Sequence, residues 1–208
     1  MSKKKSDRSD RLTRAAQRLF HRRGVHAVSL RDVAAAARVP PGGVFYHFPS
    51  KAALVRAAAE TRRAEVEALL TRLEERLADP AERVEALCAA LGEGASVTAR
   101  HGCPMLRMVT ELDGARGDEA EARAAMRAAL ADIRWFVARA LRAAGRAPRI
   151  AERESARFLA LWQGGIALAL AGGGRAVLEE ELARLPGRVL GAQGPRARKN
   201  RPEGAPGG

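Results

Sequence analysis

The stretch from Ser29 to Lys51, with the sequence SLRDVAAAARVPPGGVFYHFPSK, determines how the N-terminal part of this chain folds. Apolar residues follow a helical spacing in its first half, and Ser29 is a predicted N-cap with Asp32 as the acidic partner of a capping box. After the two prolines, Pro41 suits the first turn of a second short helix that ends near His47. The stretch therefore predicts two short helices joined by a tight turn, as in a helix-turn-helix.

On either side of this stretch the sequence also predicts helices. Residues 11–23 have apolar side chains at helical spacing, and Gly24 stands where a C-cap glycine is expected. After it, Ser50 is a predicted cap of a long helix over 51–77. Breaks that contain Gly or Pro separate further predicted helices at 82–99, 104–112, 118–144, 151–171 and 176–190. The chain is rich in Ala, Leu and Arg, so we predict an all-α fold of about nine helices.

Charge is unevenly distributed along the 208 residues. The formal net charge is +13, and residues 1–51 hold 12 Lys and Arg against 3 Asp and Glu. Residues 191–208 hold 4 basic residues against 1 acidic residue, whereas the stretch between is nearly neutral. A basic head on a neutral body is typical of a module that binds nucleic-acid phosphates.

Several classes of protein are not favoured by the sequence. Cys88 and Cys103 do not make a disulfide framework, and no spacing typical of a metal site is present. The most apolar stretch, 158–172, is 15 residues long, while a helix that spans a bilayer needs about 20. No signal peptide is recognisable, and no nucleophile–base pair or phosphate loop appears. We therefore expect a cytoplasmic protein without membrane contact, catalytic residues, metal or cofactor.

Residues 29–51, together with 11–24 upstream, resemble the DNA-binding region of TetR/AcrR-family transcriptional regulators. The resemblance implies a homodimeric repressor that binds double-stranded DNA at a palindromic operator and is released by a small-molecule inducer. It implies a helix-turn-helix DNA-binding domain at 11–50 and a ligand-binding and dimerisation domain at 51–190. We expect residues 1–10 to be a disordered basic arm and 191–208 a disordered basic tail.

The resemblance also implies which residues contact DNA. Arg31 faces outward from the first short helix and is a candidate for reading guanine, although a solvated surface arginine is the alternative. Lys51, in the first turn of a helix, is a candidate phosphate ligand. Arg38 replaces the usual turn glycine, which predicts a left-handed backbone there. The complete candidate set is Ser29, Arg31, Pro41, Gly42, Gly43, Phe45, Tyr46, His47 and Lys51.

A second, local resemblance concerns the body. Residues 102–106 (GCPML), followed by Glu111 and Leu112, resemble a stretch in the LmrA/YxaF-like branch of the same family, which implies a helix that lines an inducer pocket. Arg107 is a further candidate polar anchor. The alternative is that the bulky residues simply fill the core. The candidate ligand-binding set is Cys103, Met105, Met108, Glu111, Leu112, Trp135, Phe136, Phe158, Trp162 and Gln163.

Three further hypotheses follow from the sequence. Residues 153–190 occupy the place of the two helices that pair the subunits in this family, with the adjacent Gly164 and Gly165 permitting close approach. Cys103 precedes a helix start near basic residues, which favours either a reactive thiolate or a small buried residue. The alternatives to a ligand-responsive regulator are an architectural DNA-binding protein without a ligand and an enzyme on a helical fold.

Overall fold

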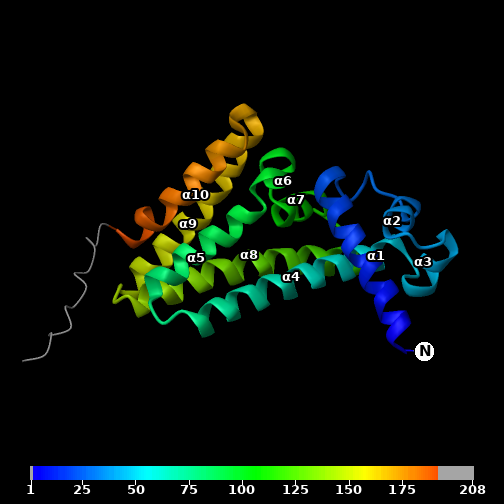
Figure 1. The fold of residues 1–208 in the computed structure, drawn as a ribbon, viewed down its shortest axis with the longest axis horizontal. Coiled ribbons are helices and arrows are strands. Elements are labelled where there is room, and N and C mark those ends of the chain that lie inside the picture. Colours follow the sequence, from blue (N-terminus) through cyan, green and yellow to red (C-terminus); the bar gives the residue numbers. More distant parts are fainter. Residues whose placement is uncertain (1, 192–208) are drawn as a thin grey trace, which may run out of the picture.

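The computed structural model describes residues 2–191, and in this part of the chain helices joined by short turns and loops are the only regular secondary structure (Figure 1). The prediction of an all-α fold is confirmed. Three helices form a head at one end of the molecule: α1 (Ser2–Arg23), α2 (Leu30–Ala37) and α3 (Pro41–His47). The body comprises α4 (Lys51–Arg76), α5 (Pro80–Glu93), α6 (Ala95–His101), α7 (Pro104–Glu111), α8 (Gly117–Ala143), α9 (Pro148–Leu168), a π-helical turn η1 (Ala169–Gly173) and α10 (Gly174–Leu190).

Local sequence signals explain how the head helices begin and end. The predicted capping box is present, because the Ser29 hydroxyl accepts from the Asp32 amide at 3.1 Å and Asp32 accepts from the Ser29 amide at 2.8 Å. Hydrogen bonds from the Ser29 backbone and hydroxyl, with a smaller contribution from Arg23, lower the pKa of Asp32 to about 2. The carboxylate therefore holds its place in the cap at any neutral or mildly acidic pH.

The turn between α2 and α3 is held by a residue outside it. Arg38 has φ 52° and ψ 47°, as its replacement of the turn glycine predicts. The Arg11 guanidinium donates to the carbonyl oxygens of Ala37 and Arg38 at 2.6 and 3.0 Å. These bonds join α1 to the turn and offset part of the strain of a non-glycine residue in the left-handed region. Phe48, just beyond α3, is buried in the core of the head, as predicted.

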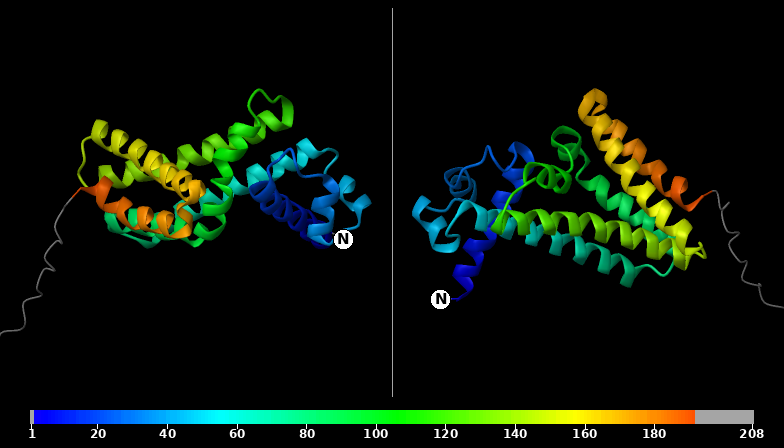
Figure 2. Two further views of the ribbon diagram at one scale, coloured as in Figure 1. Left: turned by 90° about the horizontal axis from the view of Figure 1, so that it is seen from above. Right: turned by 180° about the vertical axis from the view of Figure 1, so that it is seen from behind.

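Two long helices, α4 and α8, form the axis of the body and run parallel, side by side (Figures 1 and 2). Ion pairs link them along their length: Arg56 to Asp118 at 3.1 Å, Arg63 to Asp132 at 3.4 Å, and Glu74 to Arg139 at 2.7 Å. Each exposed pair contributes only about 0.2–1 kcal/mol. Buried residues of α8, including Ile133, Phe136 and Leu141, supply most of the cohesion.

The last two helices pack on each other within the chain, and α10 also packs on α5. Most of their larger apolar side chains are buried in this packing, among them Ile166, Leu178, Leu182 and Leu185, whereas Leu168 is exposed. A Cβ added to Gly165 would lie 3.2 Å from Glu181 Cβ and 3.6 Å from Leu178 Cδ1. Gly165 therefore serves the contact between α9 and α10 of one chain, and only Gly164 faces open space.

The structure differs from the sequence prediction in three places. The helix predicted at 82–99 is two helices, α5 and α6, because Gly94 takes a non-helical ψ of 4° and the chain turns there. Residues 2–10 belong to α1, since no Gly or Pro separates them from the apolar helix that follows, whereas a disordered arm was expected. The helix predicted at 151–171 ends as the π turn η1 near Gly172. The predicted tail lies outside the described residues except for Gly191.

No helix in the stretch from Ser2 to Gly191 is both long and apolar enough to cross a bilayer.

Candidate functional site

The surface formed by α2 and α3 lies at the end of the molecule away from α9 and α10 (Figure 1). Arg31 is exposed on α2, and Phe45 and Tyr46 are 62% and 70% exposed on α3. Aromatic rings that are this exposed are unusual on a surface in contact with water alone. These three candidates are therefore exposed on two helices that pack against each other, α2 and α3.

The two glycines of α3 have different surroundings. A Cβ on Gly43 would lie 2.9 Å from Val39, so this residue permits α3 to pack closely on the turn. Gly42 is exposed with open space around it. Pro41 occupies the first turn of α3, and the His47 ring stacks edge-on against Tyr46.

The two polar candidates beside the head helices already have partners within the chain. The Ser29 hydroxyl donates to Asp32 Oδ2 at 2.7 Å, so its proton is engaged in the cap. Lys51 Nζ donates to the carbonyl oxygen of His26 at 3.3 Å. The Lys51 ammonium has three donors and retains two for an anion.

The predicted ligand-binding residues do not line one common cavity. Six of them, Met105, Met108, Leu112, Phe136, Phe158 and Trp162, are buried in the core, as the alternative interpretation expects. Trp135 instead lies 45% exposed on α8 with the Arg134 guanidinium 5.8 Å from its ring. Glu111 faces the head. Cys103 and Gln163 line a hollow of the described surface.

That hollow is a groove of about 490 Å³ between α6, α7 and α9. Its size suits a small organic molecule. Apolar walls come from Leu106, Ile166 and Leu170, and Gln163 supplies an amide. The complete lining is Arg100, His101, Gly102, Cys103, Leu106, Arg107, Thr110, Gln163, Ile166, Ala167 and Leu170.

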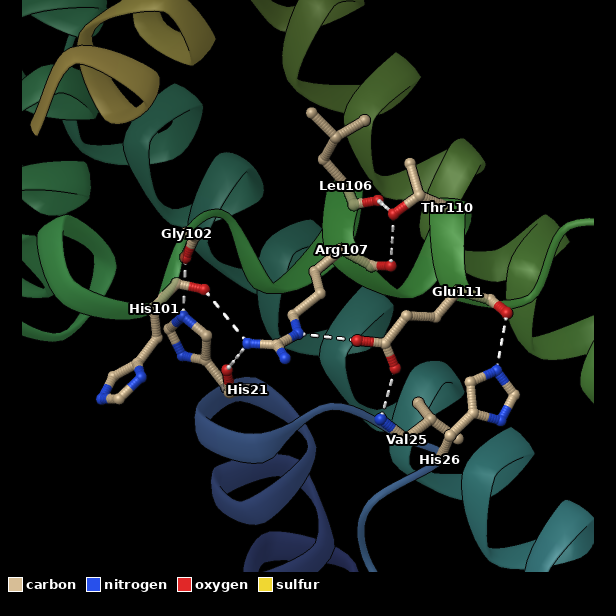
Figure 3. Close-up of polar contacts among 9 residues, drawn as sticks. All are labelled: His21, Val25, His26, His101, Gly102, Leu106, Arg107, Thr110 and Glu111. Carbon is tan, nitrogen blue, oxygen red and sulfur yellow. Dashed lines mark hydrogen bonds and ion pairs between the residues drawn. The ribbon is translucent and has the colours of Figure 1, made fainter. Parts of the chain in front are cut away.

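Arg107 and Glu111, one turn apart on α7, connect the body to the head (Figure 3). Arg107 Nε donates to Glu111 Oε1 at 2.7 Å, and Arg107 Nη1 donates to the His21 carbonyl at 3.2 Å. The second carboxylate oxygen of Glu111 accepts from the Val25 amide, and the Glu111 carbonyl lies 2.9 Å from His26 Nε2. Both side chains are partly buried, so these charge-assisted bonds are worth more than exposed pairs.

Gly24 permits the Arg107 and Glu111 side chains of α7 to lie this close to the end of α1. It has φ +86°, and a Cβ there would lie 2.5 Å from Glu111 Oε1 and 2.9 Å from Arg107 Nη2. A side chain there would require the ends of the Glu111 and Arg107 side chains to shift, and the left-handed backbone also disfavours other residues. The same glycine ends α1 and seats the head on α7.

The contact between α7 and the end of α1 is called the joint below, and His21 is its last member on the side of α1. Its Nε2 lies 2.7 Å from the Gly102 carbonyl oxygen. Burial lowers the pKa of His21 below its ordinary value of 6.5, and repulsion from Arg62, His101 and Arg107 adds to this, while the bond to Gly102 opposes it. The imidazole is therefore held neutral at neutral pH.

Cys103 caps α7, since its Sγ accepts from the Leu106 amide at 3.5 Å. Burial raises the pKa of the Cys103 thiol, and the bond from Leu106 offsets only part of that effect. Burial likewise raises the pKa of Cys88 to about 12. Of the two hypotheses for Cys103, the buried space-filling residue fits this environment and the reactive thiolate does not.

Sequence reasoning missed Gly24, His21, Val25 and His26 as parts of the joint. The i,i+4 spacing of Arg107 and Glu111 is a signal for an ion pair. Nothing local, however, indicates that the pair faces the end of α1.

A helix-turn-helix head on an all-α body is the class of protein that these features define. Residues 12–58 match the family model described as bacterial regulatory proteins, tetR family. The head and the start of α4 are therefore similar in sequence to the N-terminal domain of that family. No protein of curated function matches the chain.

Solved structures extend the similarity to the whole fold. A TetR-family transcriptional regulator from Agrobacterium tumefaciens has TM-score 0.75 and 23% identity over 88% of this chain and 98% of its own. One from Streptomyces coelicolor has TM-score 0.75 and 21% identity over 88% and 95%. A transcriptional regulator from Rhodococcus sp. Rha1 has TM-score 0.67 and 27% identity over 88% and 95%. The chain thus has the fold of TetR-family regulators.

Replacing Gly24 with Ala should disrupt the joint, and Gly114→Ala is the matched control. Gly114 also has a positive φ, +72°, but has open space around it. Both variants should lose about 1 kcal/mol of unfolding free energy from backbone strain. Gly24→Ala should lose about 0.5–1.5 kcal/mol more, because the Glu111 carboxylate and the Arg107 guanidinium must shift and their hydrogen bonds weaken. Urea denaturation measures both, and equal losses would contradict the role given to Gly24.

Lowering the pH from 7.5 to 5.5 should destabilise the protein through His21. The unfolded residue takes a proton near pH 6.5, whereas the folded one resists it, so its contribution is complete above 6.5 and declines below. His21→Gln should reduce the loss of unfolding free energy over this interval. His47→Gln, away from the joint, should leave it unchanged. An identical pH dependence for His21→Gln and the unmodified protein would show that His21 does not contribute.

Proposed function

We propose that this protein is a homodimeric transcriptional regulator that represses by binding a palindromic operator through α2 and α3. The observation that carries the proposal is the exposed surface of Arg31, Phe45 and Tyr46 on a TetR-family domain whose segment is strongly basic. Arginine is the usual reader of guanine, and lysines neutralise phosphates. In a dimer, the two heads would enter successive major grooves about 34 Å apart.

We infer that a small molecule in the body releases the DNA. The groove beside α7 shares Arg107 with the joint, so a bound molecule that shifts α7 would move the contact with α1. By reciprocity, bound operator would weaken ligand binding by the same factor. This groove favours a ligand-responsive regulator over an architectural DNA-binding protein. We also propose that the protein belongs to the LmrA/YxaF-like branch of the family, because residues 102–112 resemble a stretch of that branch.

The dimer surface that we propose lies on α9 within residues 153–190. The large apolar residues of these helices are used inside the chain, but the outer face of α9 presents small residues and an exposed leucine. These exposed residues follow one helical stripe: Ala156, Ala160, Gly164 and Leu168. Small side chains permit helices to approach closely, which supports pairing with α9 of a second copy.

Specific DNA binding should distinguish Arg31→Ala from Lys51→Ala. On DNA selected from genomic fragments, Arg31→Ala should cost about 1–3 kcal/mol and relax the preference at one position per half-site. Lys51→Ala should weaken selected and scrambled DNA alike and reduce the salt slope by about one counterion per head. Fluorescence anisotropy at several salt concentrations measures both effects.

Arg72→Ala, on the exposed surface of α4 in the body, is the control for loss of charge and should change neither quantity. If no genomic fragment is preferred over scrambled DNA, the proposed regulator is wrong. If Arg31→Ala weakens both DNAs equally, Arg31 does not read a base.

Gly164→Leu and Gly165→Leu should separate dimerisation from folding. Leucine at 164 would project into open space and should weaken the dimer while leaving the unfolding free energy of each chain nearly unchanged. Leucine at 165 would collide with Glu181 and Leu178 and should cost about 1–3 kcal/mol of folding stability. Sedimentation velocity and urea denaturation test the pair, and a monomeric unmodified protein at micromolar concentration would refute the dimer.

A further inference from the structure

The groove beside α7 has an unbalanced set of charges. Arg100, His101 and Arg107 line it, and its lining contains neither Asp nor Glu. Arg107 is paired with Glu111 and bonded to backbone carbonyls, so its charge is largely compensated and Arg100 is the main source of positive potential in the groove. Arg100 is exposed and forms no hydrogen bond or ion pair with residues that the structure describes.

One buried donor in the groove has only a weak acceptor nearby. In the described part of the chain, Gln163 Nε2 is shielded from solvent and makes no hydrogen bond to oxygen or nitrogen, and the side chain faces the Cys103 thiol, whose sulfur is a weak acceptor. A buried amide without a strong acceptor carries a free-energy cost. A bound group with acceptor oxygens would recover that cost, and the absence of carboxylates from the lining makes a negative group the favoured one.

The remaining walls are apolar. Leu106 and Leu170 are partly exposed along the groove, and Ile166 is buried at its wall. A hydrocarbon portion of a ligand would cover these leucines and remove their surface from water. The groove therefore offers donors and positive charge together with apolar surface.

We propose that this groove binds an amphiphilic monoanion, an apolar molecule that carries one carboxylate. Gln163 and Arg100 donate to the carboxylate, and Leu106, Ile166 and Leu170 contact the hydrocarbon. The role of this molecule as effector rests on the proposed function. Its binding to the groove does not, and can be measured without DNA.

Isothermal titration of the full chain with decanoate, decan-1-ol and decylamine tests the proposal, with the ions kept below their micelle concentrations and the alcohol below its solubility limit. Decanoate should bind about tenfold or more tightly than the alcohol, since a charge-assisted hydrogen bond is worth about 1.5–3 kcal/mol. The amine should bind most weakly. Gln163→Glu, which places a carboxylate in the groove, should reverse the order of decanoate and decylamine.

Arg100→Met should weaken decanoate by about threefold to tenfold while leaving decan-1-ol unchanged, because only the carboxylate loses a partner. Arg72→Met, outside the groove, is the matched control and should have no effect. Equal binding of acid and alcohol, preference for the amine, or no binding of decanoate would each overturn the proposal.

The competing occupant is a second copy of this chain. If Gln163→Glu weakens self-association in sedimentation and decanoate does not bind, the groove is an interface between copies and the proposal is overturned. DNA binding measured without decanoate tests the proposed function separately. If the protein prefers a genomic DNA fragment but does not bind decanoate, only the proposed ligand class is wrong. If it binds decanoate but shows no DNA preference, the ligand site stands and the proposed regulator is wrong.

Discussion

The bond network around the Arg107–Glu111 pair is the interaction on which the placement of the head depends. One short helix, α7, holds the end of α1 through a carbonyl, an amide and the close approach of Gly24. Because the pair is partly buried, losing one partner would leave the other charge without compensation, which costs more than the pair contributes when intact. The head can therefore change position only by a concerted rearrangement of this joint.

The second connection between head and body has a different character. α4 leaves the head and runs beside α8, held by exposed ion pairs and by a continuous apolar core. Such a long, packed contact transmits a tilt but resists bending. A molecule bound near α7 would act where the body contacts the end of α1. A small displacement of α7 would there change the angle between the head and the body.

Sequence reasoning succeeded where the determining contacts are local. The capping box of Ser29 and Asp32, the left-handed turn at Arg38 and the C-cap at Gly24 each depend on residues within a few positions, so the pattern alone predicted them. It failed where the partner is distant in sequence. Gly165 faces Glu181 of its own chain, and Glu111 faces Val25. Helical periodicity indicates which residues share a face of a helix, but not which distant element that face contacts. For Cys103 the helix terminus argued for a thiolate, but burial, which only the fold reveals, has the larger effect.

The arrangement of α7 would couple the proposed ligand and DNA sites without a long pathway. Leu106 and Thr110, one turn apart, line the groove, while Arg107 and Glu111 occupy the adjacent stripe at the joint. Allosteric coupling between sites is typically about 1–3 kcal/mol, which equals the loss of one or two charge-assisted hydrogen bonds. A rotation of this eight-residue helix that improves contacts in the groove would lengthen the bonds to His21 and Val25 by the same movement. The hydrogen bonds of Arg107 and Glu111, one turn apart, could therefore supply a coupling free energy of this size.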